Sequence, residues 1–129
     1  INNFNKGISS RICLHNNTNE KHQEMIILQK KYKFFPPKKN SKSDQSFLIL
    51  KGRLLILIFD SKGKIKSKTL LHPNETFLTR VKKNTYHCDI PLSKYSIHME
   101  TKNCRYNSKT NTFAKFKFEF NPKLIKGLN

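Results

Sequence analysis

The sequence predicts an all-β protein built as an antiparallel sandwich or barrel. Short segments rich in apolar and β-branched residues recur every 8 to 15 residues along the 129-residue chain. Some of these segments alternate charged and apolar residues, which is the period of a strand with one exposed face. Four of the five prolines lie outside the segments, as expected if they mark the connections between strands, and the fifth, Pro91, lies near the end of one segment.

The secondary structure of residues 21–29 is the most ambiguous. Residues 21–29 are compatible with a short helix or a strand, and we favour a strand from Met25, with a single helical turn before it as the alternative. The later segments are less ambiguous. The expected strands are residues 26–35, 46–52, 53–60, 64–71, 76–81, 86–92, 95–101 and 112–120.

The hydrophobic patterns assign faces to several of these strands. Residues 64–71 alternate lysine with other residues, and in residues 112–120 we expect Phe116, Phe118 and Phe120 to face inward. Residues 54–59, LLILIF, do not alternate, so both faces of this strand must be covered. The DSKG sequence that follows is a turn signal and predicts a hairpin.

The bulk properties indicate one domain. A chain of 129 residues with 36% hydrophobic residues can form one core. We expect an N-terminal arm at 1–9, a barrel at 10–120 and a tail at 121–129. The longest apolar run is far below the roughly 20 residues of a spanning helix, and the N-terminus has no apolar signal core, so we expect a soluble, cytoplasmic protein without membrane contact.

The three cysteines, Cys13, Cys88 and Cys104, are widely spaced and form no CxxC pair. This pattern favours reduced thiols over a disulfide framework or a zinc knuckle.

The formal net charge of +18 raises the possibility of a nucleic-acid-binding module. Lysine supplies 22 of the 26 basic residues, whereas reading of base edges depends mainly on arginine. The lysines are scattered along the chain, and an AT-rich genome would produce such a composition through its codons. We therefore favour a solvated basic surface, with the nucleic-acid-binding module as an alternative.

Several motifs spread over residues 8–120 are shared with one known family. They are SRICLH at 10–15, QEM at 23–25, PPKKN at 36–40, FLILKGRLLILIFDSKGKI at 47–65, TYHCDIPL at 85–92, and Glu100 followed by Tyr106. Together they resemble the WbuC-type cupins, which are found in bacterial surface-polysaccharide gene clusters. The resemblance implies a single cupin domain folded as a jelly-roll barrel and a link to O-antigen metabolism.

The metal motif of the resembled family is altered in this chain. With Gly52 fixing the register, Lys38 and Asn40 occupy the positions of two histidines and Gln45 that of a glutamate, and His87 alone is unchanged. A protonated lysine repels a cation, and carboxamides bind metals weakly. We therefore expect no metal cofactor, with a residual metal-dependent cupin as the alternative.

The resemblance also places polar residues at the mouth of the barrel, where they suit a small, oxygen-rich and anionic ligand such as a carbohydrate or sugar nucleotide. Amides bind hydroxyl groups, cations bind carboxylate or phosphate, and a tyrosine can pack on a sugar ring. The expected ligand-binding residues are Arg11, His15, Gln23, Lys38, Asn40, Gln45 and Tyr106.

The sequence leaves the roles of Lys38, Asn40 and His87 open. Lys38 and Asn40 could be ordinary exposed loop residues, and His87 could be an interior histidine without a chemical role. Alternatively, His87 could act as a general acid or base beside Glu100 in an enzyme similar to sugar-nucleotide isomerases or epimerases. A homodimer is also compatible with the resemblance.

Overall fold

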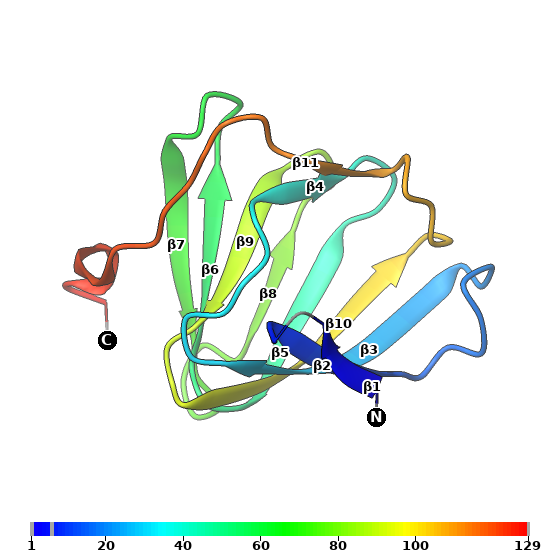
Figure 1. The fold of residues 1–129 in the computed structure, drawn as a ribbon, viewed down its shortest axis with the longest axis horizontal. Helices are drawn as coiled ribbons and strands as arrows, with labels where there is room; N and C mark the ends of the chain where they lie inside the picture. The colour runs from blue at the N-terminus through cyan, green and yellow to red at the C-terminus, as the bar shows by residue number, and fades with distance from the viewer. Residues whose placement is uncertain (1, 6, 129) are drawn as a thin grey trace.

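Two antiparallel sheets face each other in the computed structural model, which describes residues 2–5 and 7–128 (Figure 1). Residues 1, 6 and 129, which the expected arm and tail include, lie outside the described residues. Sheet A has the order β1 (Asn2–Asn5), β2 (Ser9–Cys13), β3 (His22–Lys30), β10 (Tyr95–Asn103), β5 (Gln45–Lys51), β8 (Leu78–Val81). Sheet B has the order β11 (Asn111–Phe113), β4 (Lys38–Asn40), β9 (Tyr86–Pro91), β6 (Leu54–Phe59), β7 (Ile65–Leu71). The predicted all-β antiparallel class is confirmed.

Most expected strands lie where the sequence pattern puts them, and two differ. The segment 26–35 continues only to Lys30, after which the chain turns through Tyr32 at a φ of 59°. In the segment 112–120, regular strand ends at Phe113, although Phe116, Phe118 and Phe120 are half-buried and the charged residues between them are exposed. The strand alternative for residues 21–29 is correct, since β3 begins at His22.

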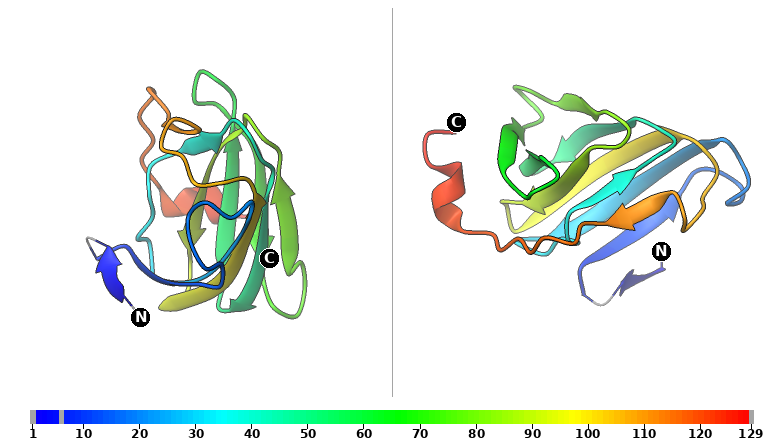
Figure 2. Two further views of the ribbon diagram at one scale, coloured as in Figure 1. Left: turned by 90° about the vertical axis from the view of Figure 1, so that its right-hand side faces the viewer. Right: turned by 90° about the horizontal axis from the view of Figure 1, so that it is seen from above.

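Strand β6 is covered on both faces, as its unbroken apolar run predicted. Its inner face packs into a cluster of buried residues between the sheets, namely Phe47, Ile49, Leu54, Ile56, Leu71 and Val81. Its outer face packs with apolar residues of β9 under the C-terminal segment, which contributes Phe116, Phe118, Phe120 and Leu124. Figure 2 shows this segment leading from β11 along one side of the molecule to the short 3-10 helix η1 (Pro122–Ile125).

Two glycines allow tight connections next to β6. Gly63 closes the predicted β6–β7 hairpin at a φ of 93°, where the Asp60 carboxylate accepts hydrogen bonds from the backbone N–H groups of Lys62 and Lys64, both at 2.9 Å. The backbone bond from Lys64 contributes most to lowering the pKa of Asp60. Gly52 has a φ of 81°, and a Cβ there would meet Ser93 and Tyr95.

The space between the sheets has two parts that differ in chemistry. We call the cluster around Leu54 and Ile56 the apolar half. The polar half lies between β2, β3 and β10 of sheet A and β4 and β9 of sheet B, where inward positions carry charged and amide side chains.

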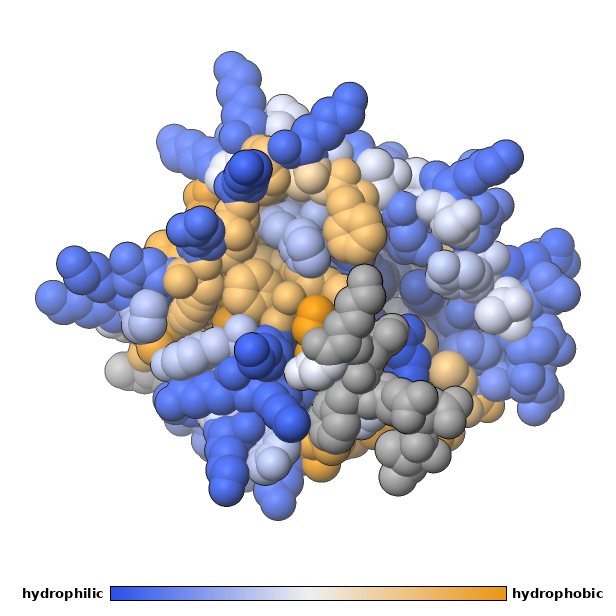
Figure 3. Space-filling view, in the orientation of Figure 1, coloured by the Kyte–Doolittle hydropathy of each residue, from blue (hydrophilic) through white to orange (hydrophobic). Residues whose placement is uncertain are grey.

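On the face of the molecule shown in Figure 3, hydrophilic side chains project around an apolar surface. Among residues 2–5 and 7–128, no helix is long and apolar enough to cross a membrane.

Candidate functional site

A cavity of about 620 Å³ opens in the polar half. Side chains from β2, β3, β4, β9 and β10 line it, together with the loop that leads into β11. The strand pleat explains this selection, because alternate residues of a strand point to the same side of the sheet. The cavity is lined by six of the residues that the sequence analysis proposed for the site, namely Arg11, His15, Gln23, Lys38, Glu100 and Tyr106.

Three cationic side chains line the cavity from three strands. Arg11 on β2, Lys38 on β4 and Lys102 on β10 all contribute. Burial lowers the pKa of Lys102, although the charge of Glu100 acts in the opposite direction. Desolvation therefore disfavours the charged form of this ammonium in the absence of a further anion.

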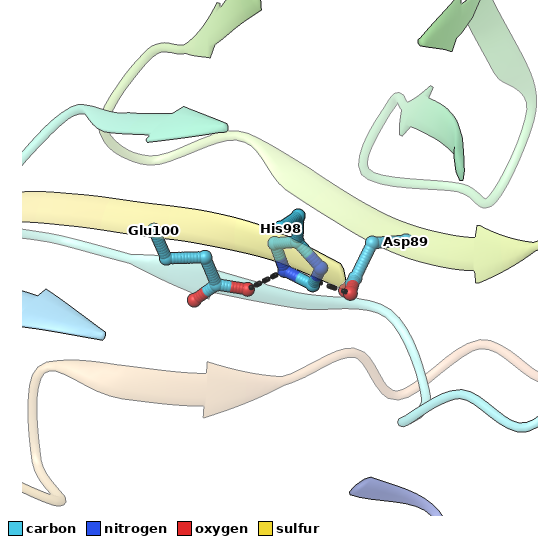
Figure 4. A group of neighbouring side chains, drawn as sticks. All are labelled: Asp89, His98 and Glu100. Carbon is cyan, nitrogen blue, oxygen red and sulfur yellow. Dashed lines mark hydrogen bonds and ion pairs between the residues drawn. The ribbon is translucent and has the colours of Figure 1, made fainter. Parts of the chain in front are cut away.

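A buried histidine lies between two carboxylates beside these cations (Figure 4). His98 Nε2 is 3.0 Å from Glu100 Oε1 and 3.8 Å from Asp89 Oδ2. The His98 side chain is fully buried, whereas the side chains of Asp89 and Glu100 retain 13% and 12% exposure and line the cavity. We call Asp89, His98 and Glu100 the triad.

The triad separates the pKa values of its two carboxyl groups. Burial, followed by the charge of Glu100, raises the pKa of Asp89 from 3.8 to about 6. Burial also opposes ionisation of Glu100, but the hydrogen bond and charge of His98 prevail and lower its pKa from 4.5 to about 2. For His98, burial favours the neutral ring, yet the hydrogen bond to Glu100 and the charges of both carboxylates raise its pKa.

The residues at the altered motif positions do not all reach the cavity. Lys38 lines it and lies opposite His87 in the pairing of β4 with β9. Asn40 is buried and forms a turn, because its Oδ1 accepts from the N–H groups of Lys42 at 2.8 Å and Ser43 at 3.0 Å. Gln45 is buried at the start of β5 and is not among the lining residues of this cavity.

His87 is an interior residue of β9. Its Nδ1 lies 3.0 Å from the Thr85 carbonyl oxygen, and its ring packs edge-on against Phe47. Burial is the main cause that lowers its pKa. Within the described chain, the hydrogen bond of Glu100 goes to His98 and none joins Glu100 to His87.

A family-type metal does not fit the residues present. The motif positions carry Lys38, Asn40, Gln45 and His87, a poor ligand set for a first-row metal. Atoms of the triad lie within 4.8 Å of one another, so their spacing alone could accommodate an ion. Its chemistry points elsewhere, because a carboxylate oxygen 3.0 Å from Nε2 requires that nitrogen to donate a proton, and Lys38 adds positive charge beside both carboxylates.

Sequence reasoning missed Asp89 and His98. Each has a simple signal in the strand period, because Asp89 follows His87 by two residues and His98 precedes Glu100 by two. Placing His87 and Glu100 inside the barrel therefore also places their i±2 neighbours inside.

Comparison with known proteins supports the fold. No family model and no curated protein sequence matches this chain. CapF bound to the inhibitor 3-isopropenyl-tropolone matches 85% of the chain with a TM-score of 0.72 and 10% identity. Recombinant oxalate oxidase in complex with glycolate matches 85% of the chain with a TM-score of 0.65 and 15% identity. KdgF from Halomonas sp. matches 84% of the chain with a TM-score of 0.65 and 13% identity.

This chain spans 32% of the CapF chain, 57% of oxalate oxidase and 90% of KdgF. These neighbours are cupin-fold proteins, so the predicted cupin fold is confirmed. At such low identity the likeness concerns the fold alone, and the WbuC-type assignment stays a prediction.

Proposed function

We propose that this protein binds a small, oxygen-rich anionic ligand of the carbohydrate class in the cavity of the polar half, without a metal. The observation that carries the proposal is the lining of the 620 Å³ cavity by Arg11, Lys38 and Lys102 together with carboxylate, amide and aromatic groups. Small-molecule sites have this size and combine apolar walls with a few convergent polar groups.

The cations favour an anionic group on the ligand. A guanidinium can bind a carboxylate or phosphate through two parallel hydrogen bonds, and an ammonium adds a point charge. The lowered pKa of Lys102 supports the same conclusion, because an anion bound nearby would offset the desolvation of the ammonium.

The remaining lining groups favour a hydroxylated ligand. Gln23 and Asn111 line the cavity with amide groups. Gln23 Nε2 already donates to the carbonyl oxygens of Thr18 and Glu20, so its Oε1 is the atom that can accept from a ligand hydroxyl. Tyr106 and Phe113 also line the cavity and remain 55% and 56% exposed, so their rings are available to pack on the apolar face of a sugar ring. Charge and hydroxyl recognition together suit a sugar acid, a sugar phosphate or a sugar nucleotide.

The neighbours and the sequence resemblance support a sugar-related role. The CapF protein of Staphylococcus aureus is described as a capsular polysaccharide assembling protein. The resembled WbuC-type cupins belong to surface-polysaccharide gene clusters. Because one fold hosts many functions, we infer from these likenesses a role in surface-polysaccharide metabolism only as part of this proposal.

Calorimetric titration tests the proposal with glucuronate, glucose 1-phosphate, UDP-glucose and neutral glucose. We expect at least one anionic probe to bind more tightly than glucose, and Arg11→Ala and Lys38→Ala each to weaken that binding about tenfold. Lys66→Ala is the matched control, since Lys66 is exposed on β7 and does not line the cavity. Absence of binding by every anionic probe, or equal weakening by Lys66→Ala, would contradict the proposal.

A further inference from the structure

We propose that Asp89 is the acid–base residue of this cavity, positioned by His98 and Glu100, and that it catalyses reversible enolisation of a hydroxycarbonyl ligand. This inference rests on the proposed function, because it concerns a ligand bound in the same cavity. The inference assigns the proton transfer to Asp89 of the triad and not to His87.

The contacts of the two carboxylates give them different roles. Glu100 Oε1 is hydrogen-bonded to His98 Nε2 at 3.0 Å, so this carboxylate is tied to the ring. Asp89 Oδ2 lies 3.8 Å from the same nitrogen, which is beyond hydrogen-bonding distance. Asp89 also lines the cavity. It can therefore contact a ligand while the His98–Glu100 pair keeps the local charge fixed.

The charges around Asp89 favour proton exchange. Glu100 disfavours a second negative charge, whereas His98 and Lys38 favour it. With its pKa raised to about 6, Asp89 can accept and return a proton near neutral pH. The groups that face the triad are Lys38 from β4, His87 from β9 and Lys102 from β10, and the pKa of His87 is lowered mainly by burial.

His87 is less suited to this role. It does not line the cavity, and its Nδ1 lies 3.0 Å from the Thr85 carbonyl oxygen. The residue is 2% exposed, so a ligand in the cavity has little access to the ring.

The proposed step is balanced without an oxidant or a cofactor. The Asp89 carboxylate takes the proton from the carbon next to the ligand's carbonyl group. The electrons of that C–H bond form the carbon–carbon double bond, and the carbonyl π electrons move onto oxygen. The Lys38 ammonium is placed to stabilise the resulting oxyanion. Return of the proton from Asp89 to carbon restores the carbonyl and the carboxylate. This enolisation is the step common to isomerisation and epimerisation of sugars.

Deuterium incorporation followed by NMR in D₂O tests the inference. The probes are fructose 6-phosphate and 5-ketogluconate, and calorimetry first establishes which of them binds. We expect exchange of the C–H next to the carbonyl in the natural protein. Asp89→Asn should slow this exchange at least a hundredfold while changing the Kd less than about threefold. His87→Gln should retain exchange, and Asp60→Asn in the β6–β7 turn is the control outside the cavity.

The positioning role of Glu100 has its own readout. In Glu100→Gln the charge that raises the pKa of Asp89 is absent, so the midpoint of the exchange-rate pH profile should move to lower pH. A residue with only a structural role would change the amplitude and leave the midpoint in place.

The outcomes separate the two proposals. If neither these probes nor those of the preceding section bind, the proposed function fails and this inference falls with it. If a probe binds and no deuterium is incorporated, only the enolisation is overturned. Exchange that persists in Asp89→Asn, or a stoichiometric divalent metal that His98→Ala removes, also overturns the inference.

Discussion

The two halves of the space between the sheets differ in their side chains: one is filled by a packed apolar cluster, and the other holds charged groups beside a cavity. In the apolar half, side chains from β5, β6, β7 and β8 form a closed hydrophobic cluster. In the polar half, inward positions of β9 and β10 carry the triad, and the cavity remains open beside it. Phe47 separates the two, with its ring centroid 5.8 Å from that of His87 and 5.9 Å from that of His98. Close packing in the apolar half stabilises the fold and so allows the polar half to hold buried charge.

The largest expected effect comes from removing this separating ring. Phe47→Ala should lower the free energy of unfolding by about 3–5 kcal/mol, since a fully buried aromatic is replaced by a void. Leu50→Ala, on the same strand but 47% exposed, is the matched control and should cost less than about 1 kcal/mol. Urea denaturation measures both, and equal effects of the two variants would contradict the division between the halves.

The next largest loss of stability is expected from a change in the triad. His98→Leu should destabilise the protein by about 3 kcal/mol, because it leaves two carboxylates side by side without the fully buried histidine that pairs with them. Restoring neutrality in the double variant His98→Leu/Glu100→Gln should recover part of this loss. A double variant less stable than His98→Leu would show that Glu100 stabilises the fold by contacts other than its pairing with His98.

The apolar half was more predictable from the sequence than the polar half. The unbroken run of β6 and the alternation of Phe116, Phe118 and Phe120 are local patterns, and they correctly indicated which faces are covered. The end of regular strand at Phe113 was not predictable, because alternation reports burial and does not report whether a partner strand is present. Short strands such as β1 and β4 lack enough residues to show a period.

The site was predictable only where a resemblance supplied a register. Arg11, Gln23, Lys38 and Glu100 line the cavity, and their binding roles stay predictions. Asn40 occupies a motif position but serves a turn, since a carboxamide can bond to the backbone of its own loop. The strand period places Asp89 and His98 inside the barrel, but their contact joins β9 of one sheet to β10 of the other, a long-range arrangement that no local pattern contains.

The pH dependence of stability sharpens the comparison, because the polar half holds buried groups with shifted pKa values and the apolar cluster holds no titrating group. The lowered pKa of Glu100 stabilises the fold above pH 4.5, and this contribution is lost as the pH falls toward 2. The raised pKa of Asp89 acts oppositely, so stability declines as the pH rises from 3.8 to 6. The raised pKa of His98 likewise gives stability that is present below 6.5 and lost above its folded value.

We therefore expect the contribution of the triad to be greatest at mildly acidic pH. Glu100→Gln should flatten both branches, because it removes the titrating carboxylate and the charge that perturbs its two neighbours. Urea denaturation from pH 2 to 8 measures this effect, with Phe47→Leu as a control that alters packing and adds no titrating group. A Glu100→Gln profile parallel to that of the natural protein would show that the triad does not set the pH dependence.

The smallest predicted effect lies outside both halves, where the C-terminal segment covers sheet B. Lys68 Nζ donates a 3.0 Å hydrogen bond to the Leu124 carbonyl oxygen, and Lys68 is exposed. An exposed bond of this kind contributes about 0.5 kcal/mol, so Lys68→Ala should lower stability by that amount. Lys66→Ala on the same strand should cause no measurable change. Hydrogen exchange of the amides around η1 should increase in Lys68→Ala alone, because this bond holds the segment at one point while Phe116, Phe118 and Phe120 hold it along its length. Equal exchange in both variants would mean that aromatic packing alone fixes the covering layer.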